Sequence, residues 1–241
     1  MAAREPIFNL PRSVVLAAVV MVGVQFLRDL LPDVEDARLL LTLAFIPARY
    51  SGEAFELPGG YVTCVTSFFT YMIVHAGWMH VTINVLWMVA FGSAVAKRIG
   101  DMRFLYFSTL CGVAGALTYL VFHLGGLAPM VGASAAISGQ MAGALRFFFN
   151  MRWGVPGAEP PDVRQVPLTS LGETFKDRRI VLFLIIWVVL NAIFGLIPQP
   201  IVGAGGGIAW EAHIGGFLCG LFSFGLFDRA SLGTPRPLQA R

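Results

Sequence analysis

The sequence contains few charged residues. Only 13% of its 241 residues are Asp, Glu, Lys or Arg, and 56% are hydrophobic. A soluble globular domain carries roughly 25% charged residues. The mean hydropathy is +0.73. This composition excludes an ordinary soluble domain and predicts a protein that crosses the membrane several times.

Cysteines and basic runs are also scarce. The three cysteines, Cys64, Cys111 and Cys219, lack the spacing of a metal site, so we interpret them as small buried residues. The net charge is only +3, and no basic run is long enough to indicate nucleic-acid binding. We therefore expect no metal, no cofactor and no nucleic-acid partner.

Long apolar runs dominate what is present. A helix needs about 20 apolar residues to cross the hydrocarbon core. A shorter, Thr-rich run at Tyr61–Val74 is expected to lie in the interface or to re-enter. The fold class that these runs predict is an all-α, polytopic six-transmembrane-helix bundle. The expected spans are Val14–Leu31, Trp78–Ala96, Phe104–His123, Pro129–Phe149, Ile180–Ile197 and Ile208–Phe227.

Basic residues predict the orientation of these spans. They gather before the first span and after the second, fourth and sixth, whereas the loops after the third and fifth carry no charge. The positive-inside rule then places both termini in the cytoplasm. We predict a cytoplasmic N-terminus (1–13), a six-span domain (14–227) with its long first loop (32–77) outside, and a cytoplasmic tail (228–241). The expected location is the cell membrane, the inner membrane of a bacterium.

Ser134 and His213 are polar residues near the outer ends of two spans. Polar groups at membrane depth are costly and so indicate function. A serine in a helix's first turns can use the unpaired N–H groups there to stabilise an oxyanion, and a neutral histidine can act as its general base. A structural serine, a proton relay or a metal-binding histidine are the alternatives. Glu211 is two residues from His213 and so faces elsewhere on a helix. We therefore do not include it as the third member of a catalytic triad with Ser134 and His213.

A second polar cluster, His75-x4-His80-x3-Asn84, lies at the start of the second span. His80 and Asn84 are one helical turn apart and share a face. Both can donate hydrogen bonds to an oxyanion. The alternative is that they only hydrogen-bond the second span to its neighbours.

Small residues predict that the fourth and sixth spans pack closely. The fourth contains Gly139-x3-Gly143 and the sixth contains Gly216-x3-Gly220. Small residues at four-residue spacing allow two helix backbones to approach. Because these two helices also carry Ser134 and His213, we expect the two side chains to meet.

The chain resembles the rhomboid intramembrane serine proteases. The matching motifs are His75-x4-His80-x3-Asn84, Gly132-x-Ser134 with Gly139, and Ala212-His213-x2-Gly216-x3-Gly220, in family order along all six spans. The resemblance implies a rhomboid-like bundle with a short central fourth span. It also implies that Ser134 is the nucleophile and His213 the base. His80, Asn84 and the Ser134 N–H would form the oxyanion site, without metal or cofactor.

The resemblance further implies what the protein acts on and how. The expected partners are transmembrane protein substrates, which enter sideways from the lipid bilayer and are cut near their outer ends. The fifth span and the segment before the sixth are expected to move to admit them. The oligomeric state stays open.

Three positions depart from the family pattern. Ala135 stands where many members have Gly, and Ser138 stands where many have a Tyr that stacks on the histidine. Ala48-Arg49-Tyr50 replaces a Trp-Arg pair, so we interpret Arg49 as a structural loop residue. With Ser138 in place of the aromatic residue, His213 must be held by some other contact.

Two other functions are compatible with a polytopic sequence. A catalytically silent rhomboid-like protein would bind membrane helices, although such relatives usually lack the serine or the histidine. A transporter or channel would show repeats and polar residues at the bilayer midplane. We find no convincing repeat, and the polar residues here cluster near one face.

Overall fold

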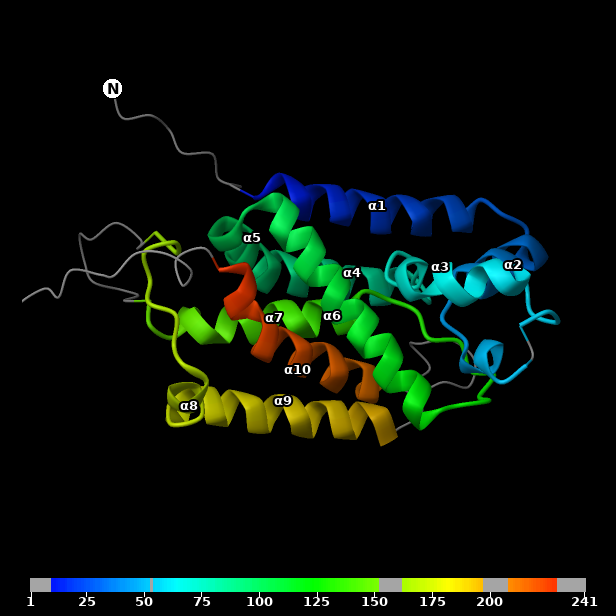
Figure 1. The fold of residues 1–241 in the computed structure, drawn as a ribbon. Helices are drawn as coiled ribbons and strands as arrows, with labels where there is room; N and C mark the ends of the chain where they lie inside the picture. The colour runs from blue at the N-terminus through cyan, green and yellow to red at the C-terminus, as the bar shows by residue number, and fades with distance from the viewer. Residues whose placement is uncertain (1–9, 53, 152–161, 197–207, 229–241) are drawn as a thin grey trace, which may run out of the picture.

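The computed structural model describes residues 10–52, 54–151, 162–196 and 208–228, which form helices joined by loops (Figure 1). In these ranges the one strand-like pairing is an isolated bridge between Phe45 and Met130. Most of the predicted N-terminal and C-terminal segments, 1–13 and 228–241, lie outside the described residues, as does Ile197 at the end of the predicted fifth span.

Ten α-helices are described, with two short 3-10 turns and one π-helical turn, η3 (Met88–Gly92), between them. The α-helices are α1 (Arg12–Asp29), α2 (Asp33–Leu43), α3 (Thr63–Thr70), α4 (Trp78–Trp87), α5 (Ser93–Ile99), α6 (Asp101–Phe122), α7 (Ser134–Phe148), α8 (Leu171–Thr174), α9 (Arg178–Leu196) and α10 (Trp210–Phe227).

Each of the six predicted spans contains one long helix or, at Trp78–Ile99, a continuous run of α4, η3 and α5. By length and composition, three described helices are able to cross a membrane: Trp78–Ile99, Asp101–Phe122 and Arg178–Gly195. The all-α class is therefore confirmed, whereas the number of six crossings stays a prediction.

The fourth predicted span begins later than expected. It was placed at Pro129–Phe149, but α7 starts at Ser134. The preceding residues are not helical because Met130 pairs with Phe45 through two backbone hydrogen bonds of 2.8 and 3.0 Å. Gly132 then adopts a φ of +105°, which favours glycine. Ser134 is consequently the first residue of its helix rather than lying a turn inside it.

The centre of the bundle is α7, which packs against both α6 and α10, and these two also pack against each other (Figure 1). Every residue from Ala135 to Phe147 is buried. A Cβ added at Gly216 would lie 2.0 Å from the Ala135 carbonyl oxygen, and one at Gly220 would lie 2.3 Å from that of Gly139. Only glycine allows this approach, so the predicted close packing of the two helices is confirmed.

The helix α9 lies at the edge of the bundle and has little protein around it (Figure 1). Only 6% of its apolar window is buried, against 39% for each of the other two candidate spans. Its contacts include the ring of Trp187, which stacks on Phe217 of α10 with centroids 4.7 Å apart. The fifth predicted span is thus loosely packed.

The long first loop contains α2, α3 and short turns. Polar contacts hold these parts of the loop together. Arg28, at the end of α1, forms an ion pair of 2.6 Å with Asp36. Arg49 is buried and donates hydrogen bonds to the carbonyls of Leu41, at 2.6 Å, and Pro58, at 3.0 Å. These contacts hold loop backbone together, which agrees with the structural role predicted for Arg49.

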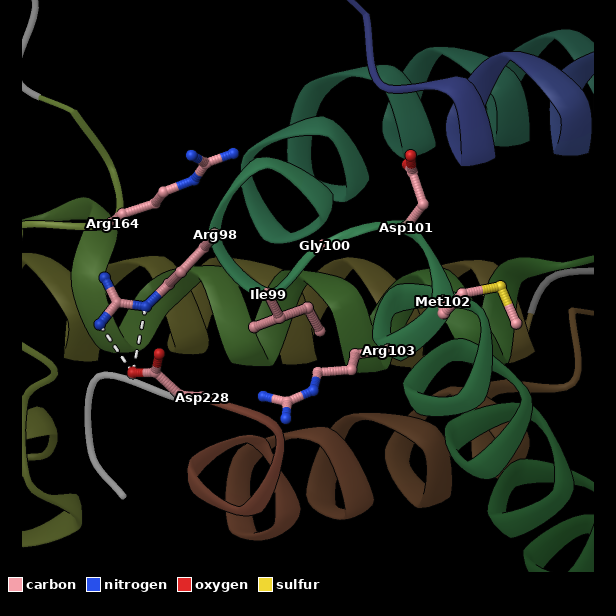
Figure 2. Close-up of a pocket in the computed structure, with 8 residues that line it drawn as sticks. All are labelled: Arg98, Ile99, Gly100, Asp101, Met102, Arg103, Arg164 and Asp228. Atoms are coloured by element: carbon pink, nitrogen blue, oxygen red, sulfur yellow. Dashed lines mark hydrogen bonds and ion pairs between the residues drawn. The ribbon is translucent and has the colours of Figure 1, made fainter. Parts of the chain in front are cut away.

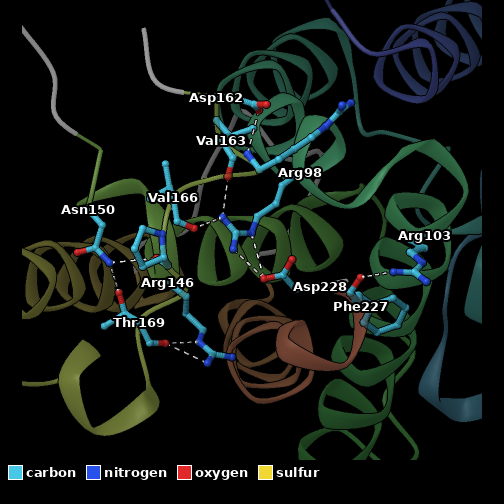
Figure 3. Close-up of polar contacts among 12 residues, drawn as sticks. Arg98, Arg103, Arg146, Asn150, Asp162, Val163, Val166, Thr169, Phe227 and Asp228 are labelled. Atoms are coloured by element: carbon cyan, nitrogen blue, oxygen red, sulfur yellow. Dashed lines mark hydrogen bonds and ion pairs between the residues drawn. The ribbon is translucent and has the colours of Figure 1, made fainter. Parts of the chain in front are cut away.

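A buried ion pair closes the end of the bundle where α10 finishes (Figure 2). Arg98 contacts Asp228 at 2.7 Å, with side chains 1% and 2% exposed. Arg98 also donates to the carbonyls of Val163 and Val166, at 2.7 and 2.9 Å (Figure 3). The pair therefore joins three segments that are remote in sequence, beside a hollow that Arg103 and Arg164 also line.

We expect Asp228→Ala to lower the free energy of unfolding by about 3 kcal/mol, because it leaves the Arg98 guanidinium buried without its counter-charge. The measurement is the unfolding midpoint of the purified protein in detergent. The matched control is Asp177→Ala, which removes an exposed pair with Arg179 (2.6 Å). The hydrogen bond from the Arg179 side chain lowers the pKa of Asp177 to about 2, so this pair is also charged near neutral pH.

Surface ion pairs contribute little to stability. The Asp177 carboxylate also accepts the Arg179 backbone N–H at 2.9 Å at the start of α9. Losing such a cap costs about 1 kcal/mol, so the Asp177 variant should unfold closer to wild type than the Asp228 variant. Equal midpoints for the two variants would show that the Arg98–Asp228 pair does not hold this end of the bundle.

Candidate active site

Ser134 lies at the point where an extended segment turns into the buried helix α7. The Gly132 N–H donates to the Tyr71 carbonyl at 2.8 Å, which ties this segment to the end of α3. No side-chain cap satisfies the first N–H groups of α7. Ser134 is half-buried. It lies beside backbone N–H groups that form no hydrogen bond within the helix, because they belong to its first turn.

His213 lies on the first turn of α10 and contacts Ser134 directly. Its Nε2 is 2.7 Å from the Ser134 Oγ. The helices α7 and α10 approach closely at Gly216 and Gly220, and this brings the side chains of Ser134 and His213 into contact. The structure thus unites two residues that are 79 positions apart in the sequence.

The other nitrogen of the His213 ring has a partner that sequence reasoning did not identify. Nδ1 is 2.6 Å from Oδ1 of Asn191, on α9. The Asn191 amide nitrogen donates to the Trp187 carbonyl one turn back, at 2.7 Å. The signal for Asn191 was present, because it is a polar residue in an otherwise apolar stretch from Ile180 to Leu196.

Ser138 does not replace the missing stacking residue. Its Oγ donates to the Ser134 carbonyl at 2.8 Å, which is a bond within the helix. His213 is held through a side-chain amide instead of the aromatic residue that the family pattern suggests at that position.

His80 lies against the segment before Ser134. A Cβ at Gly132 would be 2.7 Å from the His80 Cε1 and Nε2 atoms. The Ala76 N–H donates to His80 Nδ1 at 3.4 Å, so the proton of a neutral His80 ring belongs on Nε2. His80 therefore offers an N–H toward the chain that leads to Ser134.

Asn84 is buried, and its amide donates to the His80 carbonyl at 2.9 Å. No hydrogen bond joins it to Ser134 within the part of the chain that the structure describes. His75 lies in the loop before α4, and its ring meets His80 edge-on, with centroids 5.1 Å apart. The predicted cluster is thus assembled, with Asn84 directed at its own helix.

Glu211 lies on the first turn of α10 but bonds away from the serine and histidine. Its Oε1 is 3.1 Å from Nε2 of His123, at the end of α6. This geometry agrees with the prediction that Glu211 is not the third member of a catalytic triad. Among the described residues, no group of three or more His, Cys, Asp or Glu side chains could hold a metal ion.

The fold and this geometry define a class: a helical membrane protein with a serine–histidine pair at the start of its central helix. The chain belongs to the rhomboid family, because the Rhomboid domain model matches residues 63–229, which is more than half of its length.

One curated relative is the "Rhomboid protease GluP" of Bacillus subtilis (strain 168). The two are 26% identical over 167 residues, which make up 69% of this chain and 26% of that protein. The chain thus spans about a quarter of the length of the curated relative that it matches. The protein is therefore a membrane protein of a family that includes proteases.

Proposed function

We propose that this protein is an intramembrane serine endopeptidase that hydrolyses peptide bonds of transmembrane substrates near the outer membrane face. The observation that carries the proposal is the 2.7 Å contact between Ser134 Oγ and His213 Nε2. A serine and a base at hydrogen-bonding distance, with the base held by a third group, are the arrangement that nucleophilic catalysis requires.

The proposed reaction begins when His213 Nε2 accepts the Ser134 proton as Oγ attacks the scissile carbonyl. The oxyanion of the tetrahedral intermediate would accept hydrogen bonds from the Ser134 N–H and from His80 Nε2. Asn84 would add a donor through its second amide N–H, since the His80 carbonyl uses only one of the two. His213 then gives its proton to the leaving amine, and water hydrolyses the acyl-enzyme with the same base.

The proposal includes the topology that brings substrates to the site. Six crossings with both termini in the cytoplasm would place the starts of α4, α7 and α10 near the outer face. Ser134, His80 and His213 lie on the first turns of these three helices. Water from outside could then reach the half-buried serine and histidine.

The direct test is cleavage of a labelled single-span peptide by the purified protein in liposomes. We expect cleavage near the end of the peptide that faces the same side as Ser134. Binding of the peptide without cleavage, across several substrates with destabilised helices, would instead support a silent helix-binding protein.

If substrates enter past α9, fixing α9 to the neighbouring segment η3 should block their entry. Phe91 of η3 and Phe183 of α9 have ring centroids 6.3 Å apart. With Cys64, Cys111 and Cys219 replaced by serine, a crosslink between Phe91→Cys and Phe183→Cys should abolish cleavage of the peptide, and reduction should restore it.

A small soluble fluorophosphonate, which does not need to pass α9, should still label Ser134 in the crosslinked protein. Full cleavage with the crosslink in place would rule out entry at this position.

A further inference from the structure

The site requires something to hold the His213 ring in a fixed orientation and tautomer. A general base must present an unprotonated nitrogen to the serine, and the other ring nitrogen decides which tautomer is present. Ser138 is committed to the Ser134 carbonyl, and Glu211 pairs with His123. Neither residue can orient the ring.

The geometry points to Asn191 as the positioning residue that sets His213 as a base, which rests on the function proposed above. Its Oδ1 lies 2.6 Å from His213 Nδ1, opposite the nitrogen that faces Ser134. An amide oxygen only accepts hydrogen bonds, so Nδ1 must carry the ring proton. Nε2 is then left with a free lone pair directed at the serine hydroxyl.

The orientation of the Asn191 amide is itself determined by its surroundings. Its Nδ2 donates to the Trp187 carbonyl at 2.7 Å. The flipped amide would put an oxygen against that carbonyl oxygen, with no proton between them. Only the observed orientation satisfies both contacts, and it presents the acceptor to His213.

Asn191 is held at the right distance by packing between α9 and α10. Trp187, one turn earlier, stacks on Phe217, which is one turn after His213. Near the other end, Gly195 lies against Trp210, where an added Cβ would be 2.4 Å from Cδ1. Because α9 is otherwise little buried, these contacts and the Asn191–His213 bond contribute much of what joins this part of α9 to α10.

A purely structural role would be a hydrogen bond that only attaches α9 to α10. The two roles differ in what they change. A structural bond affects how much protein is folded, whereas a positioning residue affects the turnover of protein that is folded and the tautomer of His213.

The test compares Asn191→Leu, which keeps similar volume but has no acceptor, with Asn191→Asp, which keeps an acceptor oxygen. We expect Asn191→Leu to lower kcat roughly 10- to 100-fold with little change in KM, which is the effect of one hydrogen bond to a group that becomes charged. Asn191→Asp should keep most of the activity where its carboxyl group is protonated, because one oxygen then accepts from His213 and the O–H donates to the Trp187 carbonyl. Leu190→Ala, on the exposed face of α9, serves as the control and should match wild type.

A second measurement is independent of proteolysis. Solid-state NMR of the protein in bilayers, with 13C,15N-labelled histidine, distinguishes the two neutral tautomers. The His213 signal, assigned by its loss in His213→Gln, should show protonated Nδ1 in the wild type. In Asn191→Leu this signature should be lost or mixed with the other tautomer.

The two measurements separate the inference from the proposed function. If the wild type cleaves nothing, the proposed function fails, and the NMR signature alone decides the role of Asn191. An Nε2-protonated ring in the wild type would overturn the inference, as would full kcat in folded Asn191→Leu. If Asn191→Leu does not fold, Asn191→Asp decides: a normal kcat with an Nε2-protonated His213 ring, or a reduced kcat with the Nδ1-protonated ring unchanged, would overturn it equally.

Discussion

Ser134→Ala and His213→Ala should each reduce cleavage of a single-span substrate by roughly 10⁴-fold or more. Each change removes one half of a contact in which Nε2 and Oγ are 2.7 Å apart. The double variant should be no slower than either single variant, because a nucleophile without its base, or a base without its nucleophile, contributes almost nothing. The rates come from peptide cleavage in liposomes.

Ser138→Ala is the matched control, since it removes a serine hydroxyl one turn further along the same helix. That hydroxyl bonds only to the Ser134 carbonyl, so cleavage should stay within about threefold of wild type. If cleavage survived in Ser134→Ala, the nucleophile would be another residue or a contaminating protease, and the proposed mechanism would be withdrawn.

Gly220→Ala should also cause a large loss, although it lies two turns from His213. A Cβ there would meet backbone atoms of Gly139, with the carbonyl oxygen at 2.3 Å and Cα at 2.5 Å. Backbone cannot move aside as a flexible side chain can, so α7 and α10 must separate. A displacement of about 1 Å between reacting groups can lower the rate about 100-fold. Overpacking of this kind typically costs about 1–3 kcal/mol of stability.

The matched control is Gly23→Ala in α1, where nothing lies within 4 Å of the added Cβ. Alanine there should leave both the unfolding midpoint and the cleavage rate close to wild type. Both variants add one methyl group to a helical glycine, so the difference between them measures the packing of α7 on α10. Equal behaviour would mean that these helices can part without moving Ser134 from His213.

The sequence alone was sufficient to predict a helical segment in each of the six apolar runs and the pairing of Ser134 with His213. Helices of this kind follow from apolar runs, whose length is a local property that can be counted. The pairing was predictable because two helices carried both a reactive side chain and small residues at four-residue spacing. Where two helix backbones lie close together, the side chains on their facing sides come into contact.

The exact start of α7 depended on contacts that are remote in the sequence. Met130 is apolar and could continue a helix, but it pairs with Phe45, which is 85 residues earlier. Apolar periodicity carries no information about such a pairing. The same holds for the π-helical turn η3, where a Cβ on Gly92 would lie 2.7 Å from the Gln140 side chain of α7.

Asn191 shows most clearly what only the tertiary structure decided. Its neighbours in sequence identify it as a polar residue on an apolar helix, which indicates a partner but does not name one. The partner is determined by how α9 docks on α10 through Trp187 and Phe217. A hydrogen bond has a range of about 3 Å, so only the packing of the two helices could show that this amide meets His213. Composition and spacing therefore determined the class of protein and its serine–histidine pair, and helix packing decided how the histidine is held.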